Sequence, residues 1–117
     1  MAIKLKRVYE EPDSNDGIRI LVERLWPRGL SKEKAKVHIW LKEVSPSTEL
    51  RKWFSHDPAK WEEFKKRYYA ELEKNKRILK DALDHQHEEI VTFVYASKEE
   101  EFNNAVALKE YAEKLFR

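Results

Sequence analysis

The chain has 117 residues, 41% of them hydrophobic and 39% charged, which suits one buried core beneath a densely charged surface. Its 24 basic and 22 acidic side chains leave a formal net charge of only +2, which argues against a protein that coats nucleic acid. The absence of cysteine excludes disulfides, thiol catalysis and cysteine-ligated zinc.

The first part of the chain is rich in strand patterns. Residues Ile3–Tyr9 alternate apolar and charged side chains, and the turn-rich loop Glu10–Gly17 follows. The segment Ile18–Val22 is nearly all apolar, which is typical of a strand buried on both faces. Ser31 is suited to cap a short helix after it. The run Val37–Leu41 alternates like a strand, but it is too short to exclude a helix.

The second part of the chain is mainly helical. Ser47 is a plausible cap for a helix over residues 48–54, and Asp57 with Pro58 begins a long helix that we expect to run to about Leu83. Residues 90–95 form the clearest strand, and a last helix is expected over residues 104–116. The predicted apolar stripe of the long helix contains Trp61, Phe64, Tyr68, Leu72, Leu79 and Leu83.

These elements predict an α/β fold. We expect one domain over residues 1–117, with a small sheet of about three to four strands that is at least partly parallel. Helices pack on the sheet, among them a long central helix and a C-terminal helix. The short loop before Ile18 makes the first two strands either an antiparallel pair or not adjacent. The strands Ile18–Val22 and Ile90–Tyr95 are predicted to be parallel, as neighbours or on either side of a common strand.

Polar side chains cluster where these two parallel strands end, at the edge where open α/β sheets bind ligands. With only two glycines there is no glycine-rich phosphate loop, so side chains or a helix N-terminus would have to hold an anion. The predicted ligand-binding residues are Arg24, Trp26, Arg28, Ser97, Lys98, Asn103 and Asn104. The alternative is structural: the two arginines pair with nearby acids such as Glu99, and Trp26 caps the core.

Two further clusters carry titratable groups. Ser55, His56 and Asp57 are consecutive, and adjacent side chains cannot form a triad, although His56 could act from a loop as a general acid or base. Tyr95 is the other weak catalytic candidate. The segment "DHQHEE" at residues 84–89 resembles a helix end more than a metal site, so we expect no metal and no cofactor.

Several blocks of this sequence resemble a known family over nearly the whole chain. The specific ones are "RLWPRGLSKE", "WLKEVSPSTELRKWFSHDP" and "VYASK" followed by "NNAVAL". They are similar to the YeaO-like branch of the family called domain of unknown function 488. The resemblance implies a small cytoplasmic α/β domain with no established cofactor. Other branches can carry cysteine at Ala96 and Asn103 and histidine at Asn104, so their thiol chemistry does not carry over.

The composition also indicates where the protein works. No apolar run approaches the roughly 18 residues of a membrane helix, and the charged start of the chain does not read as a signal peptide. We therefore expect a cytoplasmic protein without a membrane partner. Many Lys and Glu with a single Met are also typical of proteins from hot environments.

Three functional hypotheses remain open. In the first, the protein binds or transforms a small anionic ligand: Arg24, Arg28 and Lys98 hold it, and Trp26 and Tyr95 wall the site. In the second, it is a non-catalytic nucleic-acid-binding or regulatory module. Its predicted basic surface comprises Lys4, Lys6, Arg7, Arg28, Lys32, Lys34 and Lys36. In the third, the many aromatic residues cover a homodimer interface.

Overall fold

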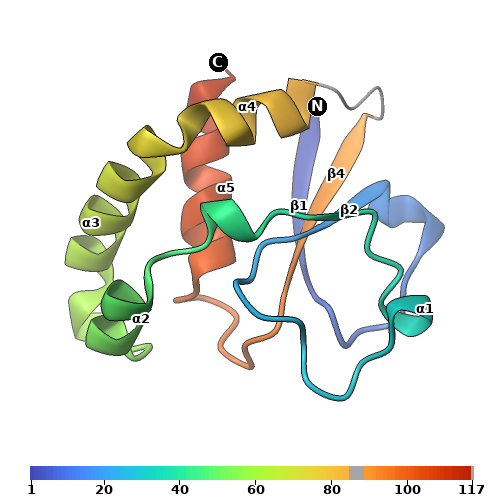
Figure 1. The fold of residues 1–117 in the computed structure, drawn as a ribbon, viewed down its shortest axis with the longest axis horizontal. Coiled ribbons are helices and arrows are strands. Elements are labelled where there is room, and N and C mark those ends of the chain that lie inside the picture. Colours follow the sequence, from blue (N-terminus) through green and yellow to red (C-terminus); the bar gives the residue numbers. More distant parts are fainter. Residues whose placement is uncertain (85–88, 117) are drawn as a thin grey trace.

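The computed structural model describes residues 1–84 and 89–116, and its centre is a parallel sheet (Figure 1). The strands are β1 (Ala2–Arg7), β2 (Ile18–Leu21), β3 (Ile39–Trp40) and β4 (Ile90–Tyr95), in the order β1-β4-β2-β3. Each of these neighbouring pairs is parallel. The prediction that β2 and β4 are parallel is confirmed, and β4 separates β1 from β2, which are therefore not adjacent.

The helices α1 and α2 begin at the residues that their predicted caps indicate. They are α1 (Lys32–Ala35), α2 (Thr48–Phe54), α3 (Trp61–Lys74), α4 (Lys76–Asp84) and α5 (Asn104–Leu115). Ser31 accepts a hydrogen bond from the Lys34 N–H, and Ser47 accepts one from the Leu50 N–H. Asp57 caps a short 3₁₀ turn that leads into α3. In the part of the chain that the structure describes, no helix is both long and apolar enough to cross a membrane.

The predicted long helix is interrupted at Asn75, so α3 and α4 replace the single helix expected to run to Leu83. The Asn75 N–H bonds to the Leu72 carbonyl at 3.0 Å, and its side chain donates to the Glu43 carbonyl at 3.1 Å. An asparagine side chain that binds backbone elsewhere competes with the helix ladder. The apolar stripe itself is confirmed, because all six of its members are buried.

The sheet has a core on each face. The larger core joins one face to α2, α3, α4 and α5, and Ile20 and Phe93 belong to it. The smaller core lies on the other face, under α1 and the loop before it, and Leu21 and Val94 belong to it. Figure 1 shows α3, α4 and α5 on one side of the strands and α1 on the other. Successive residues of a strand point to opposite faces, which explains why β2 and β4 supply both cores.

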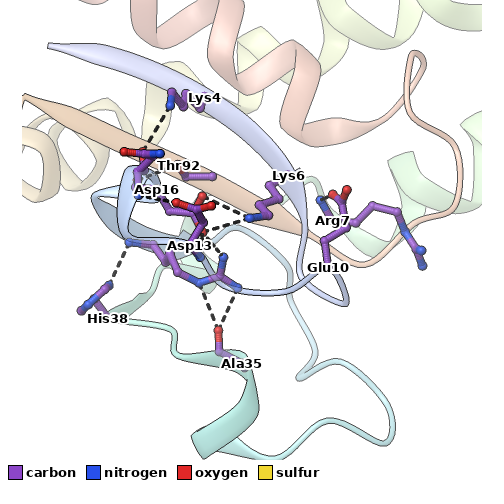
Figure 2. Close-up of polar contacts among 11 residues, drawn as sticks. Lys4, Lys6, Arg7, Glu10, Asp13, Asp16, Ala35, His38 and Thr92 are labelled. Carbon is purple, nitrogen blue, oxygen red and sulfur yellow. Dashed lines mark hydrogen bonds and ion pairs between the residues drawn. The ribbon is translucent and has the colours of Figure 1, made fainter.

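A buried ion pair fastens the loop before β2 to three other elements. The Asp16 carboxylate accepts from the Arg19 guanidinium at 2.7 Å and from the Lys6 ammonium of β1 at 3.2 Å. Arg19, only 2% exposed, also donates twice to the Ala35 carbonyl of α1, at 3.1 and 2.8 Å. Figure 2 shows the Lys6 and Ala35 contacts converging on this one region. The Thr92 hydroxyl of β4 adds a bond to the Asp16 carbonyl at 2.6 Å.

Gly17 allows this loop to pass close to β4. Its φ is +63°, and a Cβ on it would lie 2.1 Å from the carbonyl oxygen of Ile90. Any other residue would therefore meet both backbone strain and a direct clash. The turn thus holds the start of β2 beside the start of β4.

Candidate functional site

A pocket of about 450 Å³ opens at the C-terminal ends of β2 and β4. This is the edge of the sheet at which the sequence predicts a ligand. The loops that leave the two strands, the helix α2 with the turn after it, and the first turn of α5 form its walls. The lining residues are Glu23, Pro46, Thr48, Arg51, Lys52, Phe54, His56, Phe64, Ala96, Ser97 and Asn104.

Glu23 is the one carboxylate among these lining residues. It directly follows Val22, whose carbonyl accepts a hydrogen bond from the Asn104 side chain at 3.0 Å. Burial raises the pKa of the Glu23 carboxyl, although hydrogen bonds from Asn104 and the Ala96 backbone and the charges of Arg51 and His56 oppose that rise. A partly buried carboxylate of this kind is a group that proteins commonly keep for binding or proton transfer.

Two cations face the pocket from α2. Arg51 and Lys52 are exposed at the second turn of this helix, and both line the cavity. Within residues 1–84 and 89–116, neither side chain makes a hydrogen bond or a direct ion pair with another residue. Their charges are therefore available to a ligand.

His56 is held in place by backbone and by hydrogen bonding. Ser55 and His56 both have left-handed backbone conformations, with φ of +48° and +54°. The His56 Nδ1 lies 3.1 Å from the Phe102 carbonyl, and because a carbonyl can only accept, Nδ1 is the donor. The Nε2 atom is thereby left for the pocket, as an acceptor in the neutral ring and a donor in the charged ring.

An aromatic wall completes the pocket. The rings of Phe54 and Phe64 stack with their centroids 4.2 Å apart, and both residues line the cavity. Both are buried in the main core, so the wall is rigid. The pocket consequently combines an apolar side, a carboxylate and a group of cations.

Comparison with known proteins identifies the family. A profile described as "Inactive DUF488-N3 subclade" matches residues 2–117. The chain belongs to this subclade. It is 38% identical to the uncharacterised protein YeaO of Escherichia coli K12, over 98% of this chain and all of that protein. An uncharacterised protein of Mycobacterium tuberculosis H37Rv is 49% identical over 70 residues.

The mycobacterial match covers 60% of this chain and 59% of the relative, so it is a partial alignment. No solved structure matches the chain. Membership of the DUF488-N3 subclade confirms the resemblance stated from the sequence blocks. Two positions at which that resemblance implies cysteine or histidine in other branches, Ala96 and Asn104, line the pocket.

The pocket gathers only part of the predicted ligand-binding set of this DUF488-N3 protein. Ser97 and Asn104 line it, and so does the catalytic candidate His56. Lys98 is exposed outside the lining, and Asn103 is buried as the N-cap of α5. Tyr95, the other catalytic candidate, is buried at 5% exposure in the main core and is not part of the lining.

The two arginines and the tryptophan of the predicted ligand-binding set have other contacts. Arg24 donates to the backbone carbonyls of Ser45 and Pro46, at 3.4 and 3.2 Å. The Trp26 indole donates to the Leu30 carbonyl at 2.6 Å, and Arg28 is exposed. Within the described residues neither arginine forms an ion pair with an acid. Among the described residues, Arg24 and Arg28 are thus neither paired with acids, which was the alternative that the sequence left open, nor part of the cavity lining.

In the predicted basic surface, the three basic residues of β1 bind other groups of the protein. Lys4 donates to the Asn15 carbonyl at 3.2 Å, Lys6 pairs with Asp16, and Arg7 donates to the Ser97 carbonyl at 2.8 Å. Among the described residues, no cluster of three or more His, Asp or Glu side chains is arranged to hold a metal. His85 and His87, which belong to the metal question raised by the sequence, lie outside the described residues.

Sequence reasoning missed Glu23, Arg51 and Lys52. A signal for Glu23 was present, because it is the first charged residue after an apolar strand that ends at the ligand-binding edge. No comparable signal marks Arg51 and Lys52. They lie on a helix whose exposed face carries charges at several positions, and which of these charges line the pocket depends on how α2 packs against α3.

Proposed function

We propose that this protein is a binding domain for a small anionic ligand, which it holds in the pocket at the C-terminal edge of the sheet. The observation that carries the proposal is the pair of cations on α2, which line the cavity and, among the described residues, make no side-chain hydrogen bond or direct ion pair. Guanidinium and ammonium groups bind carboxylates and phosphates through charge-assisted hydrogen bonds. The description of the subclade as inactive supports binding without turnover.

The other polar groups of the pocket agree with this role. Thr48 and Ser97 place hydroxyl groups in the lining, and His56 adds a ring nitrogen. The volume of about 450 Å³ is within the range of sites for small organic molecules. The proposal moves the cation role from Arg24 and Arg28 to α2, while it keeps the ligand class and the sheet edge that the sequence predicts.

A titration followed by amide chemical shifts tests the proposal, because that measurement detects weak binding and locates it. Acetate and sulfate are added separately, against chloride at matched ionic strength. We expect saturable shifts confined to residue 23, residues 48–56, residues 96–97 and residue 104. The double variant Arg51→Gln with Lys52→Gln should lower the affinity at least tenfold, as expected for the loss of about 1.4 kcal/mol.

Two matched double variants serve as controls. Arg77→Gln with Lys80→Gln removes the same charge from exposed positions on α4 and should leave binding unchanged. Arg24→Gln with Arg28→Gln should also leave binding unchanged. A loss of binding in this double variant would show that the anion binds at Arg24 and Arg28 instead. The absence of saturable shifts in the parent protein, for both anions and for the three organic acids described below, would refute the proposed function.

A further inference from the structure

The pocket contains a charge arrangement that a simple anion does not satisfy. Glu23 presents a carboxylate to the same cavity that Arg51 and Lys52 line. The charge of Arg51 acts on Glu23, which places the two groups near one another. Yet within the described part of the chain no direct ion pair joins them. The pocket therefore has an acidic part and a basic part, which are not neutralised by contact.

Each part of such a pocket requires a different ligand group. A guanidinium is complemented by an anion, and a carboxylate is complemented by a hydrogen-bond donor. An anion without a donor group would gain the attraction of Arg51 and would also meet the repulsion of Glu23. Inside a partly buried site both effects are stronger than in water.

The hydrogen bonds around Glu23 leave room for such a donor. The Asn104 side chain and the Ala96 backbone lower the pKa of the carboxyl as nearby hydrogen-bond donors, and the Asn104 amide also donates to the Val22 carbonyl at 3.0 Å. An ionised carboxylate has about four acceptor positions, so two protein donors do not saturate it. The remaining positions can accept from a hydroxyl or an ammonium group of a ligand.

The aromatic wall adds a third requirement. Phe54 and Phe64 contribute apolar ring atoms to the lining of the cavity, and burying apolar ligand surface against them is favourable. A ligand with a carbon skeleton would contact this wall, whereas an inorganic ion would leave it open to water.

Resting on the proposed function, we infer that the ligand is a small organic acid that also carries a hydrogen-bond donor, with amino acids and hydroxy acids as the chemical class. Its anionic group lies at Arg51 and Lys52, and its hydroxyl or ammonium group lies at Glu23. An ammonium group gives the stronger contact, because donor and acceptor are then both charged.

Three acids with one skeleton test this inference: 3-phenylpropionate, 3-phenyllactate and phenylalanine. They share a carboxylate and a phenyl ring, and they carry hydrogen, hydroxyl and ammonium respectively at the same carbon. Titrations of the parent protein should give affinities in the order phenylalanine, phenyllactate, phenylpropionate. We expect the affinity for phenylalanine to be higher than that for phenylpropionate by a factor of about ten or more, as for one charged hydrogen bond.

The variant Glu23→Gln should change this order. The variant should lower the affinity for phenylalanine about tenfold and raise the affinity for phenylpropionate, because the negative charge of Glu23 is removed. Loss of folding cannot strengthen one ligand while weakening another, and the melting temperature confirms that the variant is folded. Glu49→Gln, which removes an exposed carboxylate on α2 outside the lining, should leave all three affinities unchanged.

The outcomes separate the two proposals. Equal affinities for the three acids, all of them lost on removal of Arg51 and Lys52, would overturn the inference about the ligand class and retain the anion site. The same holds if Glu23→Gln alters the three affinities equally. If none of the three acids and neither simple anion binds, both proposals are refuted.

Discussion

Glu23 illustrates how a single side chain can work against stability at a site. Its carboxylate is partly buried, and its charge is compensated by hydrogen bonds and by cations that do not touch it. A protein optimised only for folding would carry a neutral residue here. Groups that cost folding free energy and lie in a cavity are commonly retained for what they bind.

The stability of the protein should therefore depend on pH through Glu23. Its pKa is raised above 4.5 in the folded state by burial, so the folded state loses stability as the pH rises through that pKa, and the loss is absent below the unfolded value. Glu23→Gln should be more stable than the parent at pH 7. Urea unfolding at several pH values measures the difference, which should shrink toward pH 4. If Glu23→Gln were less stable than the parent at pH 7, the argument that the buried Glu23 charge destabilises the folded state would be contradicted.

At the scale of elements, the turn from α2 into α3 builds the cation side of the pocket. Phe54 stacks on Phe64 and contacts Trp61, whose ring centroid is 5.8 Å away. This packing fixes the rotation of α2, and with it the direction of Arg51. The Ser47 cap of α2 and the apolar stripe of α3 could be predicted from the sequence, because they depend on local spacing. The mutual rotation of the two helices depends on the shapes of buried rings, which no periodicity encodes.

Trp61→Ala tests that packing. The side chain is 8% exposed and its ring also lies 5.5 Å from that of Phe102. The truncation should lower the free energy of unfolding by about 3–5 kcal/mol, the range for large aromatic residues in cores. Ile78→Ala, on α4 at 39% exposure, is the control and should cost less than about 1 kcal/mol. Similar urea midpoints for the two variants would show that the aromatic cluster does not support the fold.

For the whole molecule, the ion pair of Asp16 and Arg19 joins parts that are far apart in the chain. It brings together β1, the loop before β2, and the end of α1. The parallel order of β2 and β4 could be predicted from the apolar content of the strands and from the helices between them. The position of β1 could not, because the short loop after it allowed two arrangements. The hydrogen bonds and ion pairs around Asp16 depend on that arrangement, so they could not be predicted from the sequence either.

Asp16→Asn should therefore destabilise the protein strongly. It leaves the buried Arg19 guanidinium without its anion, which typically costs about 3–5 kcal/mol. Burial alone would raise the Asp16 pKa, but hydrogen bonds from the Asp13 backbone, Arg19 and Lys6 outweigh burial and hold it below 3.8. The stabilisation is thus present above pH 3.8 and is lost as the pH falls through the folded pKa.

Unfolding of both proteins between pH 3 and pH 7 checks this expectation. The difference in the free energy of unfolding between the parent and Asp16→Asn should be constant near neutral pH and should decrease at acidic pH. Asp13→Asn changes an exposed carboxylate of the same loop, and because asparagine can also cap the turn, it should cost little. If this difference in free energy instead increased at acidic pH, the ion pair could not be its cause.

The strand order has a consequence for how the protein is made. β4 leaves the ribosome after the other three described strands, and among these strands it is the one that bonds to both β1 and β2. A nascent chain that ends before Ile90 has no central strand on which the sheet can assemble, so contacts of high sequence separation must form late. Ala96, Ser97 and Asn104 follow that strand and line the pocket. Completion of the sheet and formation of the pocket therefore belong to a single step, which cannot precede the synthesis of residues 90–104.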